Sequence, residues 1–348
     1  MELAGEALRL YGELLRMIEK NGLERVRDQL QDYLIESIRI RPEKMEDFQI
    51  KVGESKLGGM PDLPPYMEWP GLKERRFAFI AQLKLGDLTE LDKKKVLPSK
   101  GWLYFFYDND EKPWGLRQEN REHWKVLYYD GELKSLQRTA FPVEVPATSR
   151  FFPYRLKFQG EVTLPSCYSL FFEKLKQESR FNPAEEDAYC NLKEDLAAFY
   201  GDNGDYPAYR LLGYSDNIQG DMRLECERTS RGMGLALKGL PEQRLVELAG
   251  DTQQWIYLLA KDDASTCITL GTENEKSLVL PRGEPQDSGY QRAAELLDDV
   301  LQWILLLQVD SDSNENMMWG DCGRLYFWIP RKALQNKDFD QVWTILQC

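Results

Sequence analysis

The sequence predicts an α+β fold dominated by a mainly antiparallel β-sheet or roll, with peripheral helices and a helical hairpin at the N-terminus. Aromatic residues make up 12% of the chain, and aromatic side chains favour the pleated, half-buried surface of a sheet. Short apolar runs alternate with turns rich in glycine and proline, as strands do. One pair of these runs occurs twice, which indicates a duplicated β architecture.

The composition excludes several classes of protein. The 348 residues allow two or three domains, or one large β-rich unit. A formal net charge of −13 opposes binding to nucleic acid or to an anionic membrane surface. No apolar run reaches the roughly 20 residues that span a bilayer, and the first residues lack a signal-peptide pattern. The six cysteines form no Cys-x-x-Cys pair, so we expect reduced thiols and a cytoplasmic location.

Residues 1–42 are predicted to form a helical extension ahead of a β-rich domain at 43–348. Apolar residues recur at helical spacing in two stretches, which indicates two helices. The second helix would end before Pro42, because proline pushes the preceding residue out of the helical region. The two stripes are Leu3, Ala7, Leu10, Leu14 and Met17, then Val26, Leu30, Tyr33, Leu34 and Ile38. These helices would pack on their own domain, or alternatively dock on a partner.

The first β unit is expected at about 50–165. Residues 55–65 are rich in glycine and proline, so they are predicted to be irregular. Asp130-Gly131 is typical of a hairpin turn. The predicted strands of this unit are 77–85, 101–107 and 124–129.

A helical segment at about 168–202 is expected to join the first unit to a second at about 205–348. Its helices are predicted at 170–177 and 183–200, where Pro183 suits the first turn. In the second unit we expect strands at 222–228 and 255–260, a helix at 291–301, two apolar strands flanking an acidic loop within 303–330, and a short helix or strand at 338–348.

The two units share a sequence pattern. Ile80-Ala-Gln-Leu followed by Leu103-Tyr-Phe parallels Leu306-Leu-Gln-Val followed by Leu325-Tyr-Phe, so that Gln82 aligns with Gln308. The glutamine and the following leucine are separated by 21 residues in one copy and 17 in the other. This repetition predicts a pseudo-twofold pair of β units.

The same motifs resemble those of the YwqG-like family of bacterial cytoplasmic proteins, a domain of unknown function. The matching segments are Gly58–Pro64, Trp69–Gly71, Phe79–Leu83, Leu97-Pro98 with Gly101–Phe106, Leu211–Asp221, Leu305–Asp312, Met318–Ile329 and Val342–Cys348. The resemblance runs from about residue 50 to the C-terminus, with an insertion somewhere in 230–300. It implies a β-rich, roll-like fold with helices around it, and it implies no reaction.

The acidic loop after the first of these late strands is a candidate metal site. Asp310, Asp312, Asn314, Asn316 and Asp321 occupy the oxygen-ligand spacing of a calcium loop. Glu315 stands where that loop needs glycine, and no flanking EF-hand helices are evident. Two interpretations of this loop therefore remain. It binds a divalent cation such as calcium through Asp310, Asp312, Asn314 and Asp321, or these side chains cap turns.

A second acidic loop contains Asp216, Gln219 and Asp221. If the strands pair, this loop would join Gln308 and Trp319 in a ligand-binding site. The carboxylates of the two loops could also perform general acid–base chemistry. Alternatively, they hydrogen-bond to the backbone of their own loops, as Asp and Asn commonly do.

Other chemistries find little support in the sequence. His123 is the only histidine and no Gly-x-Ser-x-Gly elbow is present, so a Ser-His-Asp triad is disfavoured and His123 is expected at the surface. Cys322 lies beside acidic groups, which disfavour its thiolate. We expect a soluble, cytosolic, non-catalytic binding or interaction module that binds a protein or small-molecule partner at the acidic-loop site. The alternative is a metal-assisted hydrolase. The sequence leaves the ligand and the oligomeric state open.

Overall fold

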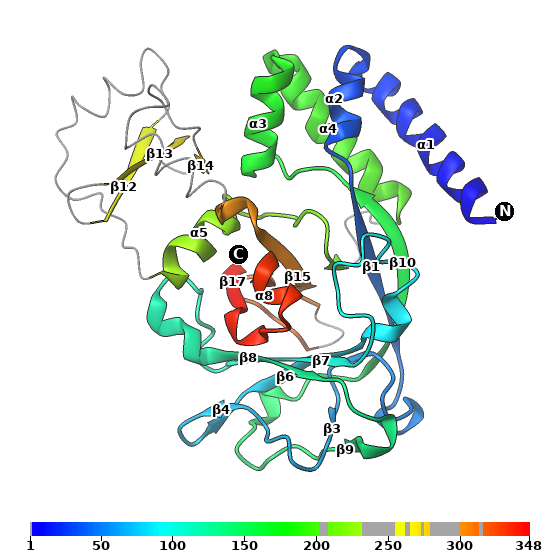
Figure 1. Cartoon of the computed structure of the whole chain (residues 1–348), viewed down its shortest axis with the longest axis vertical. Coiled ribbons are helices and arrows are strands. Elements are labelled where there is room, and N and C mark those ends of the chain that lie inside the picture. Colours follow the sequence, from blue (N-terminus) through cyan, green and yellow to red (C-terminus); the bar gives the residue numbers. More distant parts are fainter. Residues whose placement is uncertain are drawn as a thin grey trace.

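A large antiparallel sheet forms the centre of the protein in the computed structural model (Figure 1). The structure describes residues 2–201, 208–231, 255–261, 265–272, 275–278, 299–312 and 316–348. Ten strands pair in the order β17-β16-β15-β11-β1-β10-β2-β6-β7-β8. Their bounds are β1 Ile35–Lys44, β2 Lys56–Leu57, β6 Ala78–Lys84, β7 Trp102–Tyr107, β8 Trp124–Tyr129, β10 Tyr154–Thr163, β11 Tyr209–Leu211, β15 Trp303–Asp310, β16 Arg324–Pro330 and β17 Trp343–Gln347.

The sheet has the same arrangement on both sides of its central pair, β1 and β10. On each side, the four strands beyond the central strand follow one another outward in the order of the sequence. The long strands β1 and β10 pair along their whole lengths. We call β10 and the strands beyond it, β2, β6, β7 and β8, the β6 half. We call β1 and the strands beyond it, β11, β15, β16 and β17, the β15 half. Along the chain β1 precedes β2, yet it lies beside β11, while β10 lies beside β2. The strand that precedes β2 along the chain, β1, therefore pairs in the β15 half, and the strand that precedes β11, β10, pairs in the β6 half.

Each half also contains one register shift at a matching place. The β6–β7 ladder skips Ile80, and the β15–β16 ladder skips Leu306. These residues stand two positions before Gln82 and Gln308. An extra residue in one strand bends it and increases its twist, so the two bulges favour the curl that nearly closes the sheet.

The main core fills the inside of the curled sheet. Phe105 from β7 and Phe327 from β16 pack edge to face there, with ring centroids 5.1 Å apart. The free edges approach each other where Trp124 of β8 meets Trp343 of β17 at 5.1 Å, and Trp124 Nε1 donates to the carbonyl of Val342. Burying a large apolar side chain contributes roughly 1.5–3 kcal/mol, so these aromatic contacts hold the two halves together.

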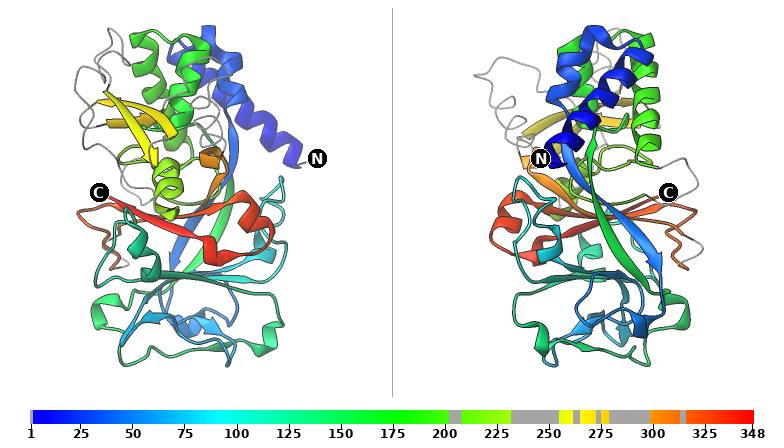
Figure 2. Two further views of the ribbon diagram at one scale, coloured as in Figure 1. Left: turned by 60° about the vertical axis from the view of Figure 1, so that its left-hand side comes forward. Right: turned by 90° about the vertical axis from the view of Figure 1, so that its right-hand side faces the viewer.

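Helices cover one end of the sheet, as Figures 1 and 2 show. Their buried side chains form a second core that includes Leu14, Ile18, Leu175 and Leu192. These helices are α1 Glu2–Lys20, α2 Arg27–Asp32, α3 Leu170–Ser179 and α4 Pro183–Phe199. Two further helices, α5 Met222–Ser230 and α8 Arg331–Gln335, lie elsewhere and contribute buried residues to the main core. The 3₁₀ turns are η1 Glu24–Val26, η2 Asp47–Gln49, η3 Leu85–Leu88, η4 Gln118–His123, η5 Leu133–Ser135, η6 Ala147–Ser149 and η7 Phe339–Gln341.

Three small sheets complete the described structure. The first pairs β3 (Asp62–Leu63) with β9 (Gln137–Arg138), and the second pairs β4 (Gly71–Leu72) with β5 (Arg75–Arg76). The third is the antiparallel set β12 Trp255–Lys261, β13 Ser265–Thr272 and β14 Glu275–Leu278. The described residues include no helix long and apolar enough to cross a membrane.

Several predicted elements are confirmed. Strands β6, β7, β8 and β12 form where apolar runs predicted them, and β15 and β16 flank the acidic loop. Of the two possibilities left open for 338–348, Trp343–Gln347 forms the strand β17. Helices α3 and α4 also match their predictions. α4 begins where the Asn182 side chain accepts from the backbone N–H of Glu185 at 3.0 Å, and Pro183 opens the first turn. Residues 291–298 of the helix expected at 291–301 lie outside the described residues.

Three predicted elements are wrong. The second N-terminal helix ends at Asp32, and Ile35–Lys44 forms the central strand β1, where backbone pairing on both sides outweighs the helical spacing of its apolar residues. The expected boundary at residue 42 therefore falls inside a strand. Residues Met222–Ser230 form α5 instead of a strand, because Asp221 caps their first turn. Asp130-Gly131 makes no hairpin, since β9 pairs with β3.

Candidate functional site

In the β15 half, two of the residues that the sequence analysis assigned to a ligand site, Gln308 and Asp216, are hydrogen-bonded to each other. The backbone N–H of Asp216 donates to Gln308 Oε1 at 2.9 Å, and Gln308 Nε2 donates to Asp216 Oδ2 at 3.0 Å. The hydroxyl of Tyr326 donates to the carbonyl of Asp216 at 2.6 Å. Three hydrogen bonds thus fix one aspartate against the outer face of the β15 half.

The β6 half contains the same arrangement around Asp62. The backbone N–H of Asp62 donates to Gln82 Oε1 at 2.7 Å, and Gln82 Nε2 donates to Asp62 Oδ2 at 3.0 Å. The hydroxyl of Tyr104 donates to the carbonyl of Asp62 at 2.7 Å. Each contact has its counterpart in the β15 half.

The turn before each aspartate is also matched. Lys56 and Arg210 stand six residues ahead of their aspartates, and each donates to a carbonyl of the turn, those of Met60 and Tyr214. Two successive residues then take positive φ values, 56° and 66° at Gly58-Gly59, and 60° and 71° at Leu212-Gly213. A Cβ on Gly213 would lie 2.5 Å from the Cβ of Ser37, so glycine is required there.

A buried ion network surrounds Asp216. Arg210 Nη1 donates to Asp216 Oδ2 at 2.6 Å, and Arg210 Nε donates to Glu161 at the same distance. Arg39 Nε binds the other oxygen of Glu161 at 2.6 Å. Burial alone would raise the pKa of Asp216, but the charges of Arg210, Lys193 and Arg324 hold its pKa well below the usual range. Asp216 is therefore an ionised structural anchor rather than a proton donor.

Asp310, Asp312 and Asp321 are the predicted metal ligands that the structure describes, and each has a different environment. Asp310 Oδ2 accepts from the backbone N–H of Ala208 and lies 2.9 Å from Arg324 Nε. Burial raises the pKa of Asp310, which Arg324 opposes. Asp312 forms a backbone bridge with Met317, Asp321 is exposed, and Asn314 lies outside the described residues. Among the residues that the structure places, no three His, Cys, Asp or Glu side chains gather as metal ligands.

The remaining predicted ligand-binding residues have structural contacts. Trp319 is fully buried, and its Nε1 donates to the carbonyl of Asp310 at 3.1 Å. Gln219 Nε2 donates to the carbonyl of Cys348 at 2.7 Å. Asp221 Oδ1 accepts from the backbone N–H of Arg223 at 2.7 Å and so begins α5. His123, expected at the surface, is only partly exposed and lies 2.8 Å from Asp108.

Asp221 lies 3.9 Å from Arg223, which lines a cavity that the sequence did not indicate. This cavity, of about 280 Å³, lies between the first residues of β1 and β15, the 91–96 segment, the Leu212–Tyr214 turn and α5. We call it the Arg223 pocket. Its apolar walls include Ile35, Ile38, Leu91, Val96, Leu212 and Ile304.

Arg223 is a buried cation in this pocket, only 5% exposed. Its guanidinium carbon lies 4.8 Å from the ring centre of Phe171 and 4.7 Å from that of Trp328. Its Nε donates to the carbonyl of Trp303 at 3.2 Å. The nearest carboxylate, Asp221, lies 3.9 Å from Nη1, which is beyond hydrogen-bond distance. Burial lowers the pKa of Arg223, so its charge is not fully compensated.

The β6 half places a tryptophan where the β15 half places this arginine. Trp69 stands seven residues after Asp62, as Arg223 stands seven after Asp216. Trp69 packs on Phe106, which matches Trp328 in the strand registers, at 5.5 Å. Its Nε1 donates to the carbonyl of Phe77 at 2.9 Å. Because Phe77 matches Trp303, the same packing and the same hydrogen bond are made by a neutral side chain.

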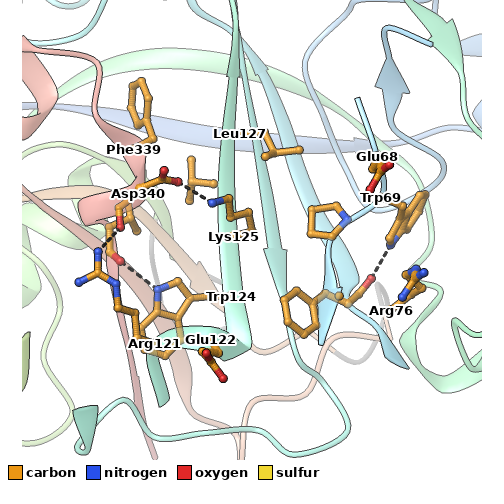
Figure 3. A pocket seen from close by; sticks show the side chains of 15 residues that line it. Glu68, Trp69, Arg76, Arg121, Glu122, Trp124, Lys125, Leu127, Phe339 and Asp340 are labelled. Atoms are coloured by element: carbon orange, nitrogen blue, oxygen red, sulfur yellow. Dashed lines mark hydrogen bonds and ion pairs between the residues drawn. The ribbon is translucent and has the colours of Figure 1, made fainter. Parts of the chain in front are cut away.

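A larger hollow of about 650 Å³ runs along the free edge of β8, beside Trp69 (Figure 3). We call this hollow the edge cleft. Its charged side chains are largely paired with other residues that line it. Lys125 binds the Asp340 carboxylate at 2.5 Å, and Arg121 donates to the carbonyl of Asp340 at 2.8 Å. The edge cleft is therefore larger than the Arg223 pocket, but its described lining includes no buried charged side chain that lacks a hydrogen-bond acceptor.

The fold defines a mostly antiparallel β protein with a few helices around a nearly closed sheet. The chain belongs to the family described as "Domain of unknown function (DUF1963)", whose pattern matches residues 55–348. The match contains nine strands of the large sheet, and the tenth, β1, precedes it. A comparison with curated proteins found no match.

Proposed function

We propose that this protein is a non-catalytic binding module and that a small ligand occupies the Arg223 pocket. The observation that carries this proposal is the guanidinium of Arg223, which is buried in an apolar cavity while its terminal nitrogens have no hydrogen-bond acceptor among the described residues. A buried charge without full compensation costs several kcal/mol. Trp69 supports the proposal further, because it makes the equivalent contacts without any charge.

The acidic loops support binding better than hydrolysis. A general base needs an available lone pair within reach of substrate, but Asp216 and Asp310 are held by cationic side chains and backbone donors. Asp221 caps α5. The metal-assisted hydrolase and the acidic-loop site thus remain predictions of the sequence, and Asp221 connects that site to the Arg223 pocket.

We also propose that the two halves arose by internal duplication with exchange of their first strands. The mirrored strand order, the bulges at Ile80 and Leu306, and the paired Asp–Gln–Tyr arrangements support this origin. The motifs Gly58–Pro64 and Leu305–Asp312 support a finer assignment to the YwqG-like group. Five free cysteines, Cys167, Cys190, Cys226, Cys322 and Cys348, support a reducing, cytoplasmic location.

A pocket-filling variant tests the binding proposal. Val96 lines the Arg223 pocket from a half-buried loop position, so Val96→Phe should fill the cavity without disturbing the sheet. The probes are n-octanol and sodium octanoate, which share an apolar body. A ligand that binds only the folded state raises its melting temperature. We expect at least one probe to stabilise the wild type and to lose this effect in Val96→Phe.

The matched control is Val143→Phe, because Val143 is 89% exposed and does not line the pocket. This variant should respond to the probes as the wild type does. The proposal fails if neither probe stabilises the wild type, or if Val96→Phe and Val143→Phe respond equally.

A further inference from the structure

Resting on the proposed function, we infer that the Arg223 pocket recognises a monocarboxylate with a compact apolar body. The first argument is the orientation of the guanidinium. Its Nε is committed to the carbonyl of Trp303, and the rings of Phe171 and Trp328 fix its plane. The unused donors are those of the two terminal nitrogens, which form a planar fork. Two parallel N–H groups match the two oxygens of a carboxylate.

The charges around the pocket favour an anion. Lys93, Lys94 and Arg331 also line it and are exposed. Lys93 lies 3.3 Å from Glu36, which balances that pair. Neither Lys94 nor Arg331 forms an ion pair with an acidic side chain among the described residues, so both add positive potential at the pocket.

The acidic groups of the pocket are already bound. Asp92 accepts from the backbone N–H groups of Val96 and Leu97 at 3.0 and 2.7 Å. Beside the pocket, Asp221 accepts from the backbone N–H of Arg223 at the start of α5. A ligand carboxylate would therefore meet a cationic fork, although the whole chain carries a net charge of −13.

The walls and the volume define the rest of the ligand. The lining is apolar on several sides, which favours a hydrocarbon or aromatic body. A volume of about 280 Å³ corresponds to roughly nine water-sized groups at about 30 Å³ each. A carboxylate on a chain of six to eight carbons, or on one aromatic ring, is of this size.

The neutral counterpart in the other half shows that the fold does not need this charge. Trp69 makes the same main-chain hydrogen bond and the same ring contact as Arg223. Removing the charge should therefore leave the fold intact, because replacing an incompletely paired buried ion with an apolar group is often neutral or stabilising. This separates a recognition role for Arg223 from a structural one.

Calorimetric titration of the full-length protein with octanoate, n-octanol and octylammonium tests the inference. We expect octanoate to bind the wild type at least tenfold more tightly than octanol, and octylammonium to bind most weakly. In Arg223→Leu, octanoate should lose at least tenfold in affinity while octanol is unchanged. Arg223→Lys keeps the charge but loses the fork, so we expect an intermediate affinity for octanoate and a reduced preference over octanol.

Arg117→Leu is the control, since Arg117 is exposed and does not line the pocket; it should keep the wild-type preference. Equal affinities of octanoate and octanol for the wild type, or an unchanged preference in Arg223→Leu, would overturn the carboxylate assignment while leaving the binding proposal standing. Octyl sulfate binding as tightly as octanoate would overturn it as well. If Arg223→Leu does not fold, Arg223→Lys decides, because a purely structural arginine would not change ligand preference.

Discussion

The β6 half and the β15 half hold an aspartate in the same way but cover it differently. In both, a glutamine and a tyrosine from the sheet bind the aspartate and its backbone. Seven residues later, one half uses Trp69 and the other Arg223 to pack on an equivalent ring. The shared contacts are what the sheet needs to fold. The difference marks where one half can bind something that the other cannot.

The largest effect should come from the cation that precedes Asp216. Arg210→Leu leaves Asp216 and Glu161 buried without their shared guanidinium. Breaking a buried ion pair by removing one partner costs about 3–5 kcal/mol. We expect a loss of this size in the free energy of unfolding, measured by urea denaturation.

The matching substitution in the β6 half should be milder. Asp62 keeps Arg138, whose Nε lies 2.6 Å from its Oδ1, when Lys56→Leu removes the nearby ammonium. We therefore expect Lys56→Leu to destabilise less than Arg210→Leu. The reverse ranking would contradict the different dependence of the two halves on their cations.

The two glutamines should instead behave alike. Gln308→Met and Gln82→Met each leave the backbone N–H and the carboxylate of an aspartate without this partner. An unsatisfied buried group costs about 1–3 kcal/mol. Comparable losses in urea denaturation would support the equivalence of the halves, whereas a loss in only one would argue against it.

Acid should weaken the β15 half through Asp216. Because the pKa of Asp216 is held below its unfolded value by Arg210, Lys193 and Arg324, its ionisation stabilises the fold above the unfolded pKa of about 3.9. This contribution is lost as the pH falls through the folded pKa. Urea midpoints between about pH 7 and about pH 3 should fall less steeply in Asp216→Asn than in the wild type. Parallel pH profiles would show that another group controls acid sensitivity.

Converting one half to the other should have a small effect on stability. Arg223→Trp gives the β15 half the residue that the β6 half uses at position 69. We expect a change within about 1 kcal/mol in the free energy of unfolding, because a neutral side chain needs no compensating anion. Octanoate should no longer raise the melting temperature. A large loss of stability would show that the two positions are not interchangeable.

The smallest expected effect is that of calcium. Asp310 is engaged by Arg324 and by the backbone of Ala208, so it has little capacity left for a cation. We expect no change in melting temperature when calcium is added, as measured by differential scanning fluorimetry. A clear rise that disappears in Asp310→Asn would restore the acidic loop as a metal site.

Local patterns predicted the sheet strands well and the central strand poorly. Phe79–Leu83 and Leu103–Phe106 are apolar runs bounded by turns, and both are strands. Gln82 and Gln308 could be aligned from the sequence because both positions hold the same residue type. The prediction for Ile35–Lys44 was wrong because the spacing of its apolar residues fits a helix as well as a strand. Its pairing partners lie more than a hundred residues away, where no local pattern can reveal them.

The pocket was missed for a different reason. Arg223 and Trp69 share a position but no chemistry, so comparing residue types cannot align them; their matching contacts in the folded structure do. The Asp310 carboxylate was expected to be available for metal, yet Arg324 from the neighbouring strand occupies it. Sequence spacing indicated which loops are acidic. It could not indicate which side chains had already found partners.

The position of β1 between β10 and β11 has a consequence for the order in which this protein can be made. While β1 leaves the ribosome, neither of its neighbours exists, because β10 ends at Thr163 and β11 lies at Tyr209–Leu211. The β6 half is complete only after β10 has been synthesised, and the nascent chain must hold an unpaired strand until then. Shortening the protein to the family match at residue 55 would remove β1 and expose β10 and β11 as new edges. Any shortened form of the chain that is meant to report on either half therefore has to begin upstream of Ile35.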